Sequence, residues 1–187
     1  MRAFDAIILS GGRAQRLGGV DKGGIDVGGR TLMAHALDAT AGARAVAVVG
    51  PPIERFGIIS TREDPPGGGP VAGVAAGLSA LAGGVNTVLV LAVDAPRAGA
   101  AVPDLLAAID SAEAAIAVDE DGKDQPLLAV YRRAALESSL ARLGSPAGAS
   151  MRLLVSRLAV TRVPIKPGAA LDADTWADVR ELRDNPW

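Results

Sequence analysis

The sequence predicts an α/β protein whose mainly parallel, doubly wound sheet is covered by helices on both faces. Apolar runs of strand length alternate with helical patterns along the whole chain, and this alternation is typical of parallel strands joined by crossover helices. With 187 residues, 49% of them hydrophobic, the chain is long enough to bury one substantial core. It shows no internal repeat, linker or low-complexity tail, so we expect a single domain over residues 1–187.

The expected elements follow one another in regular order. The first apolar run, Ala6–Leu9, suits a strand buried on both faces, and the most hydrophobic run, Thr87–Val93, should be a central strand. Further strands are expected at Ala45–Val49, Ile58–Ser60, Ala114–Val118, Leu127–Tyr131 and Ala159–Val163. Helices are expected at Thr31–Ala41, Val71–Leu81, Val102–Ala112, Ala134–Leu143, Ser150–Leu158 and Thr175–Leu182.

Composition narrows the chemistry that is open to the protein. Cysteine is absent and His35 is the one histidine, which leaves carboxylates, Arg, Lys, backbone amides and a bound metal for any reaction. We expect His35 to be a partly exposed helix residue without a direct role. A net charge of −2 argues against general nucleic-acid binding. The longest apolar run, Val88–Val93, is too short to span a bilayer, and Asp5 interrupts any signal-peptide core, so we expect a cytoplasmic protein without a membrane partner.

The segment after the first strand is the first candidate site. Leu9–Gly12 ends in a glycine pair, and Arg13, Arg16 and Lys22 follow within ten residues. Glycines let backbone N–H groups approach an anion, and arginine and lysine neutralise it. Neither the dinucleotide fingerprint G-x-G-x-x-G nor the P-loop pattern is present. With 23 glycines in the chain, an ordinary surface turn is the alternative, but the cations favour phosphate binding.

Two glycines further along the chain have two explanations. Residues 62–70 are rich in proline and glycine and lead into a predicted helix in which Gly73 and Gly77 share one face. These glycines would let a ligand approach the helix backbone, or they would let the helix pack closely on the sheet. The sequence alone supports both explanations equally.

Asp94 directly follows the expected central strand. A carboxylate at the C-terminal end of such a strand lies at the edge where open α/β sheets bind ligands. Asp94 could cap the next turn, but its place level with the first loop favours a Mg²⁺ ligand. The acidic stretch Asp119–Asp124 lacks the spacing of a calcium loop, and we interpret it as a solvated hairpin or loop.

Several of these stretches together resemble one known family. L-S-G-G-R-A-Q-R-L-G-G-V-D-K, residues 9–22, is similar to the L-x-G-G-x-x-x-R-[ML]-G-x-D-K signature of nucleotidyltransferases related to molybdenum cofactor guanylyltransferase. Gly69–Gly73 matches the family's G-P-x-A-G, and Val93–Pro96 matches its metal-binding C-D-x-P. The resemblance extends over nearly the whole chain. It implies the Rossmann-like fold of the nucleotide-diphospho-sugar transferases.

The resemblance also implies an activity and its residues. The reaction would be Mg²⁺-dependent transfer of GMP from GTP to the phosphate of molybdopterin, with proteins that supply and receive the cofactor as partners. Arg16, Lys22 and Asp94 would be catalytic, and Asp94 would hold the metal. The candidate nucleotide-binding residues are Leu9, Ser10, Gly11, Gly12, Lys22, Asp64, Gly69, Gly73 and Asp94.

Asp172 and Asp174 depart from the family, which often has two asparagines here. Two more carboxylates beside a triphosphate are favourable only if a cation lies between them. We therefore expect Asp174, and less so Asp172, to approach Asp94 and share Mg²⁺; the alternative is that Asp174 only caps the last helix. Lys22 likewise could form only a surface ion pair with Asp21. Three alternatives for the function stay open: another phosphate acceptor, CTP as the nucleotide, or a nucleotide-binding module without turnover.

Overall fold

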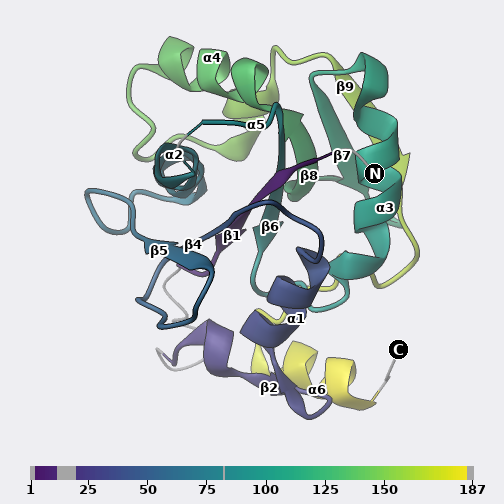
Figure 1. The fold of residues 1–187 in the computed structure, drawn as a ribbon. Helices are drawn as coiled ribbons and strands as arrows, with labels where there is room; N and C mark the ends of the chain where they lie inside the picture. The colour runs from purple at the N-terminus through teal and green to yellow at the C-terminus, as the bar shows by residue number, and fades with distance from the viewer. Residues whose placement is uncertain (1–2, 12–19, 82, 185–187) are drawn as a thin grey trace.

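A computed structural model describes residues 3–11, 20–81 and 83–184 (Figure 1). One seven-stranded sheet, with the order β5-β4-β1-β6-β8-β7-β9, forms its centre. The strands are β1 (Asp5–Leu9), β4 (Val46–Val49), β5 (Ile58–Thr61), β6 (Thr87–Ala92), β7 (Ala114–Val118), β8 (Asp124–Arg132) and β9 (Val160–Pro164). The helices are α1 (Leu32–Ala39), α2 (Pro70–Ala80), α3 (Val102–Ala108), α4 (Arg133–Leu143), α5 (Met151–Val155) and α6 (Trp176–Asp184).

The sheet reverses its winding direction between β1 and β6. The chain places β4 and β5 on one side of β1 and then crosses to β6 on the other side, and all four strands run parallel. Within this sheet, as far as the described residues form it, only β8 runs antiparallel to its neighbours, β6 and β7. The expected mainly parallel, doubly wound sheet is therefore confirmed. In such sheets ligands bind outside the carboxyl ends of the strands at the point of reversal, here the ends of β1 and β6.

Helices cover both faces of the sheet (Figure 1). The side chains of β1 alternate, so that Ala6 and Ile8 join the core under α1, α3 and α6, while Ile7 and Leu9 join the core under α2, α4 and α5. All of β1 is buried, as expected for a strand covered on both faces. In the described part of the chain no helix is both long and apolar enough to cross a bilayer.

Gly73 and Gly77 bring α2 close to the sheet. A Cβ atom at Gly77 would lie 2.7 Å from Cγ2 of Ile7, and one at Gly73 would lie 3.0 Å from Cδ2 of Leu9. The N–H of Gly73 also donates to the carbonyl of Gly69, at 3.0 Å. Close packing of helix on sheet therefore accounts for glycine at both positions.

A short hairpin that the sequence analysis missed precedes α1. Its strands are β2 (Asp26–Val27) and β3 (Arg30–Thr31), and Gly28 and Gly29 form the turn with φ values of 64° and 79°. Such a two-residue turn with positive φ at both positions is the favoured hairpin connection. The carbonyl of Val27 accepts a hydrogen bond from Nε2 of His35 at 2.9 Å. The expectation of a partly exposed His35 was wrong, because the hairpin covers it and leaves 8% of the residue exposed.

The acidic stretch forms the predicted turn, here between β7 and β8. The carboxylate of Asp119 accepts hydrogen bonds from the backbone N–H groups of Asp121 and Lys123 and from the side-chain amide of Gln125. The bond from the Lys123 N–H is the main reason why the pKa of Asp119 is lowered. The negative charge of Asp119 therefore stabilises the turn.

Candidate active site

The loops after β1 and β4 meet at the reversal point of the sheet. Backbone N–H groups of Ser10 and Gly11 both donate to the carbonyl of Val49, at 2.8 and 3.1 Å. Gly50 follows with φ of 149°, and a Cβ atom there would lie 2.7 Å from the backbone nitrogen of Gly11. Only glycine permits this approach. Gly50 is not among the predicted site residues, although the strand that ends directly before it could have indicated its position.

Lys22 links two carboxylates at this edge of the sheet. Its Nζ lies 2.8 Å from Oδ2 of Asp94 and 2.6 Å from Oδ1 of Asp174. Lys22 opens the 3₁₀ helix η2 (Lys22–Gly24), Asp94 follows β6, and Asp174 lies just before α6. Burial by itself would lower the pKa of Lys22, but hydrogen bonds from its ammonium to Asp174 and Asp94 outweigh burial and raise this pKa. We call Lys22, Asp94 and Asp174 the lysine cluster.

The surface pair between Lys22 and Asp21 does not form. Oδ1 of Asp21 accepts instead from the backbone N–H of Gly23, at 3.1 Å, and so caps η2. The backbone N–H of Val93 donates to the carbonyl of Leu9 at 3.0 Å, which extends the β1–β6 pairing up to Asp94. The backbone before Asp94 is therefore fixed to the end of the parallel sheet, and the turn that carries Lys22 is held by its own cap.

Two local contacts place Asp174 in the cluster. The N–H of the fully buried Ala173 donates to the backbone carbonyl of Asp94, at 2.8 Å. Thr175 and Asp178 cap α6 reciprocally: Oγ1 of Thr175 accepts from the N–H of Asp178, and a carboxylate oxygen of Asp178 accepts from the N–H of Thr175. The expected approach of Asp174 to Asp94 is thus seen, and Thr175 rather than the Asp174 side chain caps the helix.

Asp172 lies beside the cluster without joining its hydrogen bonds. Its side chain reaches the surface, but the surrounding protein shields the carboxylate from bulk water and, together with the charges of Asp94 and Asp174, raises its pKa to about 6. Within the described ranges no group of three or more acidic or histidine side chains is arranged to hold a metal. The carboxylates that converge on one point in this site are those of Asp94 and Asp174, which share Nζ of Lys22.

The remaining predicted residues lie around the first loop. Leu9 and Ser10 are buried, with Oγ of Ser10 facing Gly23 of η2, while Gly11 is exposed. Gly69 is the N-cap residue of α2, with φ of 90°. It has no side chain, so the first N–H groups of this helix receive no cap from it. Gly12 and Arg16 lie outside the described residues.

The loop that carries Asp64 borders Gly11. Glu63, which the sequence analysis did not single out, accepts from the N–H of Gly67 at 2.9 Å and lies within 3.9 Å of a Cβ built on Gly11. Asp64 itself is exposed. The structure therefore brings the first loop, the 63–69 loop and the lysine cluster to the same edge of the sheet.

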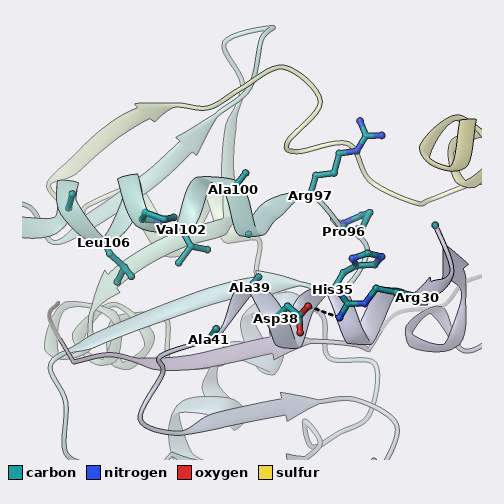
Figure 2. Close-up of a pocket in the computed structure, with 14 residues that line it drawn as sticks. Arg30, His35, Asp38, Ala39, Ala41, Pro96, Arg97, Ala100, Val102 and Leu106 are labelled. Atoms are coloured by element: carbon teal, nitrogen blue, oxygen red, sulfur yellow. Dashed lines mark ion pairs between the residues drawn. The ribbon is translucent and has the colours of Figure 1, made fainter. Parts of the chain in front are cut away.

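A cavity beside α1 is a separate feature of the described chain. It encloses about 790 Å³ between α1 and the segment from Pro96 to Ala107, and most of its walls are apolar (Figure 2). Arg30 and Asp38 form an ion pair at one end, close to His35. None of Lys22, Asp94 and Asp174 lines this cavity. The lysine cluster is the better active-site candidate, because it lies at the reversal point, where open α/β sheets bind ligands.

Comparisons with known proteins show the family to which the chain belongs. Residues 6–161 match the MobA-like NTP transferase domain. A molybdenum cofactor guanylyltransferase from Acidiphilium cryptum (strain JF-5) is 40% identical over 140 residues, which are 71% of this chain and 69% of that protein. Among solved structures, molybdopterin-guanine dinucleotide biosynthesis protein A from Archaeoglobus fulgidus has a TM-score of 0.72 at 19% identity, over 96% of this chain and 97% of that one.

A second solved structure widens the range of nucleotides found on this fold. The 2-C-methyl-D-erythritol 4-phosphate cytidylyltransferase from Thermus thermophilus has a TM-score of 0.70 at 23% identity, over 98% of both chains. The fold is thus shared by transferases named for different nucleotides, and the family match is what narrows the assignment. The protein is a nucleotidyltransferase and belongs to the MobA-like NTP transferase family.

Proposed function

We propose that this protein transfers GMP from GTP to the phosphate of molybdopterin, giving the guanine dinucleotide form of the cofactor and pyrophosphate. The observation that carries the proposal is the lysine cluster at the reversal point of the sheet, in a chain related to a molybdenum cofactor guanylyltransferase. A cytoplasmic place of action is part of the proposal, since GTP is supplied there. Proteins that deliver molybdopterin and accept the dinucleotide are the partners we expect.

The proposed reaction needs no general base. The acceptor phosphate has a second pKa of about 6, so it is largely dianionic at neutral pH and can attack directly. One of its oxygens forms a bond to the α-phosphorus of GTP, and the bond from that phosphorus to the bridging oxygen breaks, so that pyrophosphate leaves with the electron pair. This suits a chain without cysteine whose one histidine is buried against the β2–β3 hairpin.

Charge and alignment are what the protein must supply instead. The ammonium of Lys22 would offset the charge that builds up on the α-phosphate and the leaving pyrophosphate. We assign the same task to Arg16, which lies outside the described residues. The backbone of Leu9–Gly12 would seat the nucleotide, with Asp64 at the rim of the site and Gly69 at the open end of α2.

Asp94 and Asp174 fit a bound Mg²⁺. Both carboxylates contact the same nitrogen atom, so their oxygens can converge on one small cation. Mg²⁺ is commonly held by one or two carboxylates together with substrate phosphates and water. When bound, it would neutralise phosphate charge and favour departure of pyrophosphate.

Pyrophosphate release tests the proposal. The wild type would be assayed with GTP, CTP, ATP and UTP, each with and without molybdopterin and Mg²⁺, and with other small phosphomonoesters as acceptors. We expect release with GTP and molybdopterin only, and none from Asp94→Asn under the same conditions. A preference for CTP or for another acceptor would replace the guanylyl assignment. Nucleotide binding without release in any combination would favour a module without turnover.

A further inference from the structure

We propose that Lys22 occupies the cation position between Asp94 and Asp174 until a nucleotide phosphate draws its ammonium away, so that the divalent-cation site forms only when nucleotide binds. The inference rests on the proposed function in one respect: it takes Asp94 and Asp174 as the carboxylates that hold the metal. It adds that nucleotide binding and metal binding in this site are coupled, and that Lys22 holds the cation position in the free protein.

The geometry leaves no room for a metal beside the ammonium. Nζ of Lys22 lies within hydrogen-bond distance of both carboxylates, at 2.8 and 2.6 Å. A Mg²⁺ ion requires the same oxygens at about 2.0–2.1 Å, and an ammonium held against them would repel it strongly at such a separation. Only 15% of the Lys22 side chain is exposed, so the ammonium is held in place rather than free in solvent. A metal that enters the free protein must therefore displace Lys22.

The lysine side chain can change partners while its backbone stays in place. The carbonyl of Lys22 accepts from the N–H of Ile25, and Asp21 caps the same turn through Gly23. The four-carbon stem of lysine is flexible and ends in a compact charge with three donors. A triphosphate at this edge offers oxygen acceptors, so the ammonium can leave the carboxylates without losing its ionic partner.

Charge balance makes the two binding events depend on each other. The cluster has one ammonium and two carboxylates, so a triphosphate alone approaches a site with excess negative charge, while a metal alone meets the ammonium. When both arrive, Lys22 pairs with phosphate and the carboxylates receive the cation. By linkage, each ligand then raises the affinity for the other by the same factor.

Binding of Mn²⁺, used as a spectroscopic probe for the divalent cation, tests this inference in the absence of nucleotide. Electron paramagnetic resonance would measure free Mn²⁺ in titrations of the wild type and of Lys22→Ala, with circular dichroism to confirm folding. We expect Lys22→Ala to bind Mn²⁺ roughly tenfold or more tightly than the wild type, because the competing charge is gone. Adding Asp94→Asn to Lys22→Ala should remove this gain.

Two control variants separate competition at the site from a change in net charge. Lys22→Arg keeps a cation in the cluster and should show no gain. Lys166→Ala removes the same charge from an exposed side chain and should also bind Mn²⁺ like the wild type. A gain of similar size in Lys166→Ala would overturn the inference, since net charge alone would then explain it.

The result of the Mn²⁺ titrations does not depend on whether the protein catalyses the proposed reaction. Lys22→Ala that binds Mn²⁺ no more tightly than the wild type would overturn the inference, even if the wild type transfers GMP as proposed. A gain in Lys22→Ala would support it, even if neither GTP nor molybdopterin proves to be a substrate. For the wild type we expect GTP to raise the affinity for Mn²⁺ at Asp94. Asp94→Asn titrated with GTP serves as the control, because it measures the Mn²⁺ that GTP holds without this carboxylate.

Discussion

Two ionic clusters stand at opposite ends of β1, with opposite arrangements of charge. At the start of the strand the fully buried carboxylate of Asp5 lies between Arg44 and Arg133, at 2.9 and 2.8 Å. Beyond the end of the strand the ammonium of Lys22 lies between Asp94 and Asp174. Each cluster holds one charge between two of the opposite sign.

The two clusters differ in how many hydrogen bonds their charged groups make and in how far these groups are exposed. Asp5 accepts three hydrogen bonds from the two guanidinium groups, and Arg133 also donates to the backbone carbonyl of Val85. In the lysine cluster each carboxylate has one oxygen on Lys22, and half of the Asp174 side chain is exposed. A saturated buried cluster stabilises one structure, whereas an unsaturated one can exchange partners. We infer that the first serves stability and the second serves the reaction.

The largest expected effect is on stability, at the first cluster. Asp5→Ala should lower the free energy of unfolding by about 3–5 kcal/mol, because the buried Arg133 loses the carboxylate to which it donates a hydrogen bond and is left with the longer contact to the exposed Glu137, at 3.7 Å. Urea denaturation measures this loss. Arg44→Ala should cost less, since 44% of the Arg44 side chain is exposed. A loss below about 1 kcal/mol for Asp5→Ala, the range of exposed ion pairs, would contradict the structural role.

Lys22→Ala should show the reverse pattern. We expect the rate of transfer to fall roughly a hundredfold or more, because a cation placed at the reacting phosphates is lost. The free energy of unfolding should fall less than in Asp5→Ala, because both carboxylates of the lysine cluster reach solvent, whereas Asp5 is fully buried. Pyrophosphate release and urea denaturation on the same preparation measure both. Arg16→Ala should act likewise. A wild-type rate in Lys22→Ala would show that its ion pairs only hold the loops together.

Substitutions of the two glycines of α2 that face β1 distinguish a role in packing from a role in ligand binding. Gly77→Ala should destabilise the protein by about 1–3 kcal/mol through overpacking against Ile7, and Gly73→Ala should act in the same direction against Leu9. Neither should change the affinity for GTP, measured by calorimetry. A loss of GTP affinity in Gly73→Ala without a loss of stability would restore the explanation in which a ligand approaches this helix.

The smallest expected effect comes from Asp174→Asn. The concentration of Mg²⁺ that gives half-maximal transfer should rise roughly tenfold, because one charged ligand becomes a neutral one. The melting temperature should stay the same, since Thr175 caps α6. If the variant keeps both its melting temperature and its Mg²⁺ requirement, the shared metal is refuted and Asp94 holds it alone.

The two clusters also differ in how far the sequence predicts them. Asp94 follows a recognisable central strand, at the edge where open α/β sheets bind ligands. The approach of Asp174 could be expected from charge, since carboxylates beside a triphosphate are favourable only around a shared cation. The Asp5 cluster could not be expected, because Arg44 and Arg133 lie 39 and 128 residues away in sequence. Asp5 was interpreted only as a break in a signal-peptide core. No local pattern marks a buried carboxylate whose partners come from distant elements.

The other features that the sequence did not predict also depend on contacts that no local pattern encodes. The strands β2 and β3 have two residues each, which is too short for the alternation that identifies a strand, and the burial of His35 depends on them. Lys22 has Asp21 as its neighbour in sequence, but its ion pairs are with residues 72 and 152 positions away. The central strands and most helices were predictable because their apolar periodicity is local.

A crystal structure of the protein with Mg²⁺ and a non-hydrolysable GTP analogue tests the central claim most directly, namely that the cluster beyond the end of β1 is a phosphate and metal site. We predict that Nζ of Lys22 leaves both carboxylates for a phosphate oxygen, and that Asp94 and Asp174 hold Mg²⁺ in its place. A nucleotide bound elsewhere, for example in the cavity between α1 and α3, with Lys22 still bridging Asp94 and Asp174, would contradict the account.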